Sequence, residues 1–295
     1  VLNGTLVADS WLKVSDSLWV TDWEYLFPEG PEDWWNRRSN ERFTPMHRFN
    51  NDAVFIDGQF LQSVGSTEEV DEGTFFVDYE GKKIFIGANP EGRFVEITAF
   101  RKALHRTLEM EHGKEPDKIG PVIKGITFTQ FADTMVHIGG GGLAIDQHGR
   151  DAVGTVFENC TFSNCFRIAM FAISDNLVMR NCNVVNSNTE GIYVVASADI
   201  LLERNIIENN NIEKWTGFYP SAVKIFNQSH RAIFRDNLVR NHPNSNGVWW
   251  DVGNSDGVYI RNFAEKIAQS ALFFEISTGL TVAGNTFVDC DQSIF

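Results

Sequence analysis

Two acidic residues, Asp251 and Glu275, stand at matching places in two similar stretches of the chain. Each closes a short apolar run, Gly247-Val-Trp-Trp-Asp251 and Ala271-Leu-Phe-Phe-Glu275, and they are 24 residues apart. If the runs are neighbouring parallel strands, the two carboxyl groups project from one face about 5 to 6 Å apart. In retaining glycosidases, two carboxyl groups about 5 to 5.5 Å apart do the chemistry, one attacking the anomeric carbon and the other transferring the proton. Asp251 and Glu275 are therefore the candidate catalytic residues.

The surroundings of this pair favour a sugar site. Two like charges at that distance cannot both ionise freely, which suits an acid/base residue. Trp249, Phe273 and Phe226 border the pair, so the cleft is expected to be partly apolar, as sugar-binding clefts are. The alternative is that both carboxylates are solvated groups on an outer face, where acidic residues commonly lie.

A repeat in the second half of the chain supplies the neighbouring strands. Its period is in the low twenties, with one longer gap of 32 residues, and short β-prone runs carry it. Such a period predicts a stacked solenoid, here a parallel β-helix with one coil per repeat. The asparagines that mark it are expected to be structural, with amides stacked along the axis at the turns. They are Asn159, Asn181, Asn205, Asn237, Asn262 and Asn285.

Aligning the strands that precede these asparagines separates inward from outward side chains, because strand side chains alternate. The predicted inward rows are Ile168, Ile192, Val223, Val248, Leu272 and Met170, Val194, Ile225, Trp250, Phe274. The predicted outward rows are Ala169, Tyr193, Lys224, Trp249, Phe273 and Phe171, Val195, Phe226, Asp251, Glu275.

Several further residues are candidates for substrate binding. Lys224, one coil before Asp251, is expected to bind a sugar hydroxyl, to tune the nucleophile or to act as a general base. Lone histidines in loops are more often surface groups than catalytic ones, and His148 and His242 are weaker candidates for that reason. The substrate-binding candidates are Lys224, Trp249, Trp215, Tyr219, Tyr193, Glu190 and His137.

Two coils are too long for the period. One excess falls on the glycine-rich stretch 137–149, which lacks the lysine and the strand-to-helix context of a phosphate-binding loop. The other falls on 211–220 and carries Trp215 and Tyr219. Insertions in repeat proteins loop out on one face, so the second is expected to wall the subsite beside Asp251; the alternative is that Trp215 plugs the coil above.

Residues 1–118 show no coil period and are expected to form a separate antiparallel β domain, sandwich-like and packed beside a β-helix of residues 119–295. Hairpins are predicted at 53–62, around Asp57-Gly58, and at 74–87. The charged stretch 109–118 is a candidate linker. The first residues are, alternatively, part of the solenoid. The chain is expected to be part of a longer protein, with a leader and further coils that are missing from this sequence.

Composition narrows the partners. The net charge of −14 disfavours nucleic acid, anionic membranes and strongly anionic polymers. Neither a membrane span nor a signal peptide is visible; a secreted or periplasmic location is expected, and an oligomer is possible. The four cysteines lack metal-ligand spacing and are expected to be buried thiols, so no metal or other cofactor is expected.

Residues Asn246–Asp251 and, one coil later, Ser270–Ser277 resemble the Gly-Ile-Trp-x-Asp and Gly-x-x-x-Glu-Ile pattern of right-handed β-helix carbohydrate-active proteins. The chain is similar in particular to glycoside hydrolase family 120, the β-xylosidase family. The resemblance implies a right-handed parallel β-helix with a small β-sandwich, and a retaining enzyme for plant or algal poly- or oligosaccharides, above all β-xylosides. It implies Asp251 as nucleophile and Glu275 as acid/base.

Two other functions fit the same fold. One is a calcium-dependent polysaccharide lyase, with Lys224 or an arginine as base and the acidic pair holding Ca²⁺. The other is a non-catalytic glycan-binding solenoid.

Overall fold

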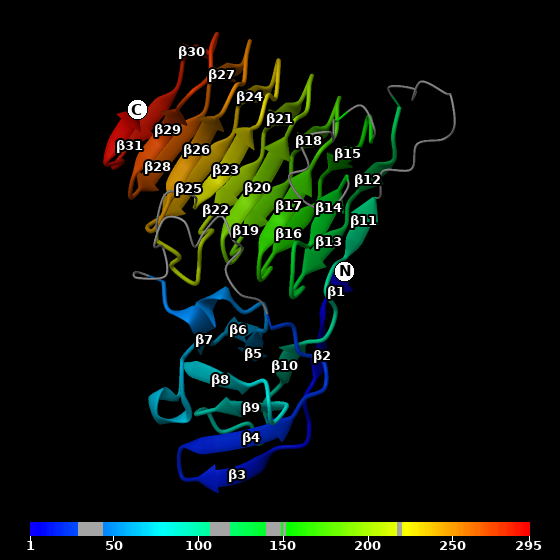
Figure 1. Ribbon diagram of the computed structural model, residues 1–295, viewed down its shortest axis with the longest axis vertical. Helices are drawn as coiled ribbons and strands as arrows, with labels where there is room; N and C mark the ends of the chain where they lie inside the picture. The colour runs from blue at the N-terminus through cyan, green and yellow to red at the C-terminus, as the bar shows by residue number, and fades with distance from the viewer. Residues whose placement is uncertain (29–43, 107–118, 140–148, 150–151, 217–219) are drawn as a thin grey trace.

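Three long parallel sheets stack into a solenoid, with a smaller β domain beside it, in the computed structural model of this chain (Figure 1). The structure describes residues 1–28, 44–106, 119–139, 149, 152–216 and 220–295. Each coil contributes one strand to each sheet, and each strand pairs with its counterpart in the next coil. This is the predicted parallel β-helix.

The sheet that carries the candidate catalytic residues, called the site sheet below, has eight strands. In spatial order they are β11 (Leu104–Arg106), β14 (Val136–Ile138), β17 (Ile168–Ala172), β20 (Glu190–Val195), β23 (Ser221–Phe226), β26 (Asn246–Asp251), β29 (Ser270–Phe274) and β32 (Gln292–Ile294).

The other two sheets complete each coil. One contains β1 (Leu2–Asn3), β13 (Thr127–Thr129), β16 (Thr161–Ser163), β19 (Asn183–Val185), β22 (Ile206–Glu208), β25 (Leu238–His242), β28 (Phe263–Ile267) and β31 (Thr286–Val288). The other contains β12 (Val122–Lys124), β15 (Val156–Glu158), β18 (Val178–Arg180), β21 (Leu201–Glu203), β24 (Ile233–Arg235), β27 (Val258–Ile260) and β30 (Thr281–Ala283).

The solenoid core is built from stacked apolar side chains. The inward rows predicted for Ile192, Val223, Val248 and Leu272 are in register as expected. Rings stack along the axis as well: the Phe234 and Tyr259 ring centres lie 5.4 Å apart, in parallel planes. The same packing continues into the next coil, where Tyr259 stacks on Phe287.

The predicted register is wrong for one strand. Ile168 was aligned with Ile192, but Met170 is the partner of Ile192 and Phe171 that of Tyr193. The outward row therefore contains Phe171 in place of Ala169. A shift of two residues keeps every side chain on its own face, so alternation alone could not detect it.

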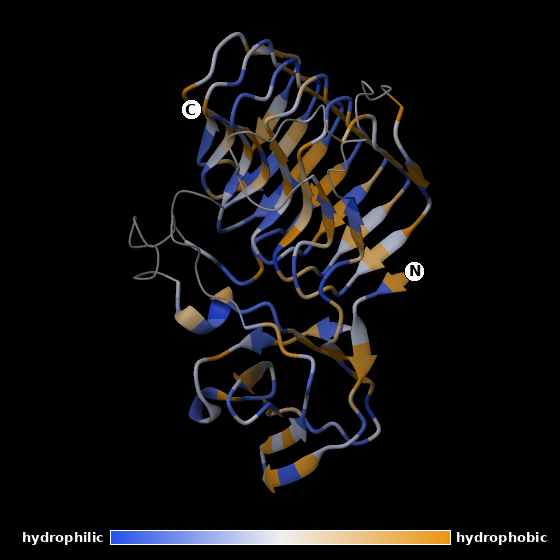
Figure 2. Ribbon diagram, turned by 45° about the vertical axis from the view of Figure 1, so that its right-hand side comes forward, coloured by the Kyte–Doolittle hydropathy of each residue, from blue (hydrophilic) through white to orange (hydrophobic). Residues whose placement is uncertain are grey.

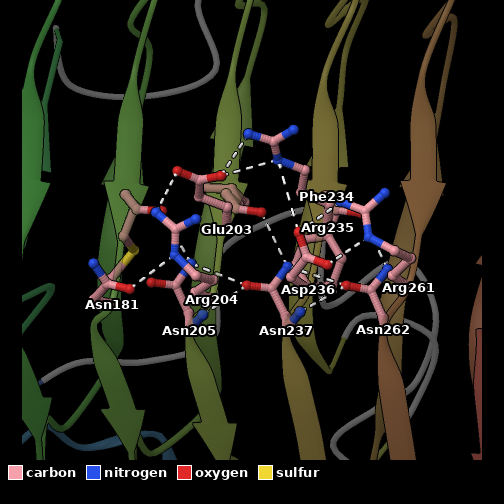
Figure 3. Close-up of polar contacts among 12 residues, drawn as sticks. Asn181, Glu203, Arg204, Asn205, Phe234, Arg235, Asp236, Asn237, Arg261 and Asn262 are labelled. Carbon is pink, nitrogen blue, oxygen red and sulfur yellow. Dashed lines mark hydrogen bonds and ion pairs between the residues drawn. The ribbon is translucent and has the colours of Figure 1, made fainter.

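The asparagine ladder is real, but it has four asparagine members. In Figure 3, Asn237 Oδ1 accepts hydrogen bonds from the backbone N and the side-chain amide of Asn205, at 2.9 and 3.1 Å. Asn262 does the same for Asn237, and Asn285 for Asn262.

Asn159 and Asn181 lie one position before the ladder, which is a correction to the predicted alignment. Both have left-handed backbone, with φ of 54° and 53°, and Cys160 and Cys182 occupy the ladder positions of their coils. Asparagine suits both positions, since it tolerates left-handed backbone better than most residues. Three of the four cysteines are buried thiols, as predicted; Cys290 is partly exposed.

The smaller domain is made of two sheets. One has β2 (Thr5–Val7), β10 (Val95–Thr98), β5 (Val54–Ile56) and β6 (Gln59–Phe60); the other has β3 (Leu12–Ser15), β4 (Leu18–Asp22), β9 (Lys83–Ile86), β8 (Thr74–Asp78) and β7 (Gln62–Ser63). Short 3₁₀ helices span Met46–Phe49 (η2) and Thr67–Glu69 (η3). Figure 2 shows hydrophobic and hydrophilic residues alternating along the β3–β4 hairpin, the period of two typical of strands.

Both predicted hairpins are present. β5 and β6 pair antiparallel around Asp57 and Gly58, whose φ angles are 51° and 77°. Positive φ at both central residues is what a two-residue hairpin turn requires. β8 and β9 form the second hairpin.

The boundary between the domains differs from the predicted residue 118. β1 pairs in parallel with β13, and β11 with β14, so both belong to the solenoid. The antiparallel sheets lie between them in sequence. The small domain is inserted between these two strands of the first coil. Each strand is short and stands alone in the sequence, so no repeat period can be recognised there. The candidate linker 109–118 lies almost wholly outside the described residues.

The segment from Asn211 to Thr216 joins the solenoid to the small domain. Glu213 is buried there; its carboxylate accepts hydrogen bonds from the Gln62 side chain and, at 3.4 Å, from Ser63 N. Glu213 Oε2, which accepts from Gln62, also lies 3.8 Å from Arg48 Nε. None of the helices in the described part of the chain is long and apolar enough to cross a membrane.

Candidate functional site

Four consecutive strands of the site sheet, β20, β23, β26 and β29, carry the site on their outer face (Figure 1). One outward row is formed by residues that pair directly between neighbouring strands: Tyr193, Lys224, Trp249 and Phe273. Asp251 pairs with Phe226 two positions further along. These paired residues are 24 to 31 positions apart in the sequence, so it is the stacking of the coils that brings them together in one cluster.

Asp251 and Glu275 are neighbours on adjacent coils. Asp251 is the last residue of β26, and Glu275 directly follows β29, where Trp250 pairs with Phe274. The Glu275 backbone N donates to Trp250 O at 2.8 Å, so the backbone pairing between the two coils continues as far as Glu275. Adjacent strands are about 4.8 Å apart. Asp251 is buried at 8% exposure, whereas Glu275 is partly exposed.

Lys224 is the centre of the cluster. Its Nζ lies 3.0 Å from Asp251 Oδ2, and the side chain is almost completely buried. The same nitrogen lies 3.6 Å from the centre of the Trp249 ring and 5.2 Å from that of Phe226, as a cation over aromatic faces. Burial lowers the pKa of Lys224, while attraction to Asp251, Glu190 and Glu275 opposes that shift. The ammonium is therefore a buried cation surrounded by carboxyl groups.

Glu190 adds a third carboxyl group to the cluster. It is 3% exposed, and Tyr193 donates its hydroxyl hydrogen to Glu190 Oε1 at 2.8 Å. Burial raises the pKa of Glu190 to about 7, against the opposing effects of the hydrogen bond from Tyr193 and of the Arg167 and Lys224 charges. Burial and the neighbouring Glu190 raise the pKa of Tyr193 far above its ordinary value. Tyr193 is therefore a hydrogen-bond donor here.

Aromatic rings line the cluster on the side of the C-terminal coils. The Trp249 and Phe273 rings stack with centres 4.7 Å apart and planes 19° from parallel. Tyr193 and Phe226 meet edge to face at 5.2 Å. The flanks are therefore as apolar as the sequence predicted.

His137 shares the outward row but lies outside the cluster. It is in strand β14, two strands before Tyr193, where its ring packs at 4.9 Å on Phe171 and at 5.0 Å on His105. His242 is fully buried in another sheet, where burial lowers its pKa to about 4. His148 lies outside the described residues.

Trp215 lies in the contact between the two domains. The ring is 1% exposed, packs at 4.4 Å on Phe49 and donates through Nε1 to Arg48 O. It reaches the cluster through Arg167, whose guanidinium lies 5.1 Å from the ring centre. It therefore presents no open ring face to a sugar, which follows from how tightly the small domain packs here. Tyr219 lies outside the described residues.

Arg167 was not recognised from the sequence. It precedes β17, the strand whose register was predicted wrongly, and it is an isolated charge without a motif. The only signal available was its place one coil before Glu190, which required the correct register.

The described residues contain no group of three or more histidine, cysteine, aspartate or glutamate side chains placed to hold a metal ion. A cavity of about 220 Å³ lies in the small domain, lined by residues that include His47, Asp52 and Tyr79. None of the residues that line it belongs to the cluster on the site sheet.

Stacked parallel coils with an acidic pair and a buried lysine on one outer face define a parallel β-helix protein with a polar site. The chain belongs to the right-handed β-helix family: the model described as "Right handed beta helix region" matches residues 134–295, more than half of it. No curated protein sequence is significantly similar to this chain.

Two solved structures resemble the chain. One is the complex of XylC with xylose, with a TM-score of 0.71 at 14% identity over 97% of this chain. This chain spans 55% of that protein. The other is described as a glycoside hydrolase, with a TM-score of 0.45 at 10% identity over 99% of this chain and 81% of that one; it is too distant to bear on the argument. The likeness to the first establishes the fold.

Proposed function

We propose that this protein is a glycoside hydrolase that retains the anomeric configuration, and that its substrates are β-xylosides of plant or algal origin. One observation carries the proposal: Asp251 and Glu275 are adjacent on neighbouring coils, and a buried lysine contacts Asp251 at 3.0 Å. That arrangement supports the different roles that the family resemblance implies for the two carboxyl groups.

The two environments suit different roles. A cation beside a carboxylate favours its ionised form, and Lys224 therefore keeps Asp251 ready to act as the nucleophile. Glu275 is more exposed and directly follows β29, the last of the four strands of the site. It is the group that can exchange its proton with a leaving group and with water.

The reaction follows from these roles. Asp251 attacks the anomeric carbon and forms a C–O bond with the sugar, while Glu275 donates its proton to the departing glycosidic oxygen as that bond breaks. Water then attacks the anomeric carbon, Glu275 takes one of its protons, and the bond to Asp251 breaks. Asp251 regains its negative charge, Glu275 regains its proton, and two inversions give net retention.

The partly exposed Phe273 ring supports a sugar as the ligand, because aromatic faces pack against the apolar faces of sugars. Trp249 is 3% exposed and lies between Lys224 and Phe273, so it backs the Phe273 ring. Xylose is proposed as the sugar from the family resemblance of the Asp251 and Glu275 segments, together with the shared fold of a protein solved with xylose bound. Poly- and oligosaccharides with terminal xylose are the substrate class to test first.

The deciding experiment compares Asp251→Asn and Glu275→Gln with the wild-type protein on aryl β-xylosides and a wider panel of glycosides. We expect each variant to lose at least about 1,000-fold in kcat/KM, as expected for a group that acts in the bond-breaking step. Glu265→Gln, on β28 in a different sheet, is the matched control and should keep wild-type activity. The anomer first formed, identified by proton NMR, should be the β-anomer.

Substantial activity in both Asp251→Asn and Glu275→Gln would overturn the proposal, as would an inverted product. Two further outcomes identify the alternatives. Ultraviolet-absorbing unsaturated products from a uronate polymer, dependent on calcium, would identify a lyase. Glycan binding without released reducing ends, unchanged in either variant, would identify a binding protein.

A further inference from the structure

Glu190 is a buried carboxyl group to which the catalytic scheme gives no role. It opens strand β20, and its environment is polar on three sides. Tyr193 donates to it within its own strand. The charges of Arg167, in the preceding coil, and of Lys224, on β23, act on it as well. Thr189, directly before it, donates its hydroxyl hydrogen to Arg167 O at 2.9 Å.

Lys224 connects this carboxyl group to the catalytic pair. The same ammonium that contacts Asp251 at 3.0 Å is attracted by Glu190 and by Glu275. Tyr193, which donates to Glu190, is close enough to Asp251 to respond to its charge. A change of charge on Glu190 therefore acts on a cation that both catalytic residues share.

We propose that Glu190 is a positioning residue that exchanges a proton with solvent and, through Tyr193 and Lys224, sets the pH range in which the site is active. The inference rests on the proposed function and assigns that site its pH control. Burial raises the pKa of Glu190 to about 7, so its charge changes in the range where such an enzyme works.

The direction of the effect follows from the charges. Below that pH, Glu190 is neutral, and Lys224 has Asp251 as its ionised partner. Above it, Glu190 carries a negative charge, which stabilises the positive charge that develops on the sugar. The ionised form should therefore extend activity toward higher pH.

The first test needs no substrate. Difference infrared spectroscopy follows the carbonyl stretch of protonated carboxyl groups in the wild type and in Glu190→Gln. We expect a carboxyl group that deprotonates near pH 7 in the wild type and is missing from Glu190→Gln. Lys224→Met should move its midpoint to higher pH, because a neighbouring cation favours the carboxylate.

Glu213→Gln is the matched control. It removes another buried carboxyl group with a pKa of about 7, located in the domain contact and away from Lys224. If Glu190→Gln folds poorly, Tyr193→Phe replaces it: loss of the hydroxyl donor should raise the Glu190 midpoint. The inference is overturned if no carboxyl signal is specific to Glu190. It is also overturned if the pH midpoint of that signal is the same in Lys224→Met as in the wild type.

The second test is the pH dependence of kcat/KM. In Glu190→Gln the basic limb should move down by about one pH unit, the size of shift a nearby charge produces, whereas Glu213→Gln should keep the wild-type profile. A wild-type profile in Glu190→Gln overturns the inference and leaves the proposed function intact. If the wild type hydrolyses no glycoside, the proposed function fails, and the infrared shift in Lys224→Met still decides whether Glu190 and Lys224 are coupled.

Discussion

At the scale of single residues, the central feature is a lysine that the protein has removed from water. Lys224 combines an ion pair with Asp251 and contact with the face of Trp249. Burying a charge is unfavourable unless a partner compensates it, and removing one partner of a buried pair is strongly destabilising. Replacing either Lys224 or Asp251 should therefore be destabilising, and Lys224 can be tested by mutation in the same way as the carboxylates.

We predict that Lys224→Met lowers kcat/KM by at least about 100-fold, because it leaves Asp251 buried without its cation. The acid limb of the pH profile should also move to higher pH, since a carboxylate without its cation is protonated more easily. The measurement is kcat/KM across the pH range on an aryl β-xyloside.

Lys224→Arg is the control for this change. It keeps the charge but replaces a compact ammonium with a planar guanidinium. The acid limb should therefore return close to its wild-type pH, while kcat/KM should be restored only in part. A Lys224→Met variant with the wild-type profile would show that the ion pair has no role in the reaction.

At the scale of elements, the turns hold neighbouring coils together by two adjacent rows of residues with different roles. One row needs left-handed backbone: Asn181, Arg204, Asp236 and Arg261 all have φ near 55° and lie on the surface, where their side chains form hydrogen bonds and ion pairs (Figure 3). The next row points its amides into the structure and forms the ladder. A backbone role and a side-chain role are thus separated by a single residue.

We predict opposite results for two asparagines that look alike in the sequence. Asn237→Ala should destabilise the protein by about 2 to 3 kcal/mol, because it leaves two buried N–H groups of Asn205 without their acceptor and removes a hydrogen bond to the carbonyl of Leu202. Asn181→Gly should be close to neutral, because glycine accepts the left-handed backbone without strain. Urea unfolding of both variants measures the difference, and equal losses would contradict the division of roles.

These two rows also show how far sequence reasoning reached. The repeat and the alternation predicted the β-helix, the site sheet and the adjacency of Asp251 and Glu275, because those depend on period alone. They could not separate Asn159 or Asn181 from the ladder, nor fix the register of β17, because both errors preserve the local pattern. The place of Arg167 beside the Glu190 coil depended on that register and was missed for the same reason.

At the scale of the whole molecule, a carboxyl group connects the two domains. Glu213 on the solenoid segment is 2% exposed and faces Arg48, Gln62 and Ser63 of the small domain. Burial raises its pKa from an ordinary 4.5 to about 7, against the opposing effects of these partners. The domain contact therefore contains a group that prefers to be neutral.

The folded protein thus holds a proton on Glu213 at pH values where the unfolded chain has lost it. Its contribution to stability is complete below about pH 4.5 and is lost as the pH rises through about 7. We predict that the free energy of unfolding falls between pH 5 and pH 8, by up to about 3 kcal/mol from this group. Calorimetry across this range should show a shallower fall for Glu213→Gln, and an unchanged slope in that variant would contradict the assignment.

The divided first coil has a consequence for how the chain reaches this structure. Leu2 pairs with Phe128 across 126 residues, and the antiparallel domain lies between. The central coils close loops of 22 to 32 residues, and shorter loops cost less entropy to close. Solenoids can nucleate anywhere and grow by nearest-neighbour contacts, so we expect folding to begin in the central coils and spread outward. The β1–β13 pairing should form last, after the small domain has brought its two ends together, and it should be the first pairing to open.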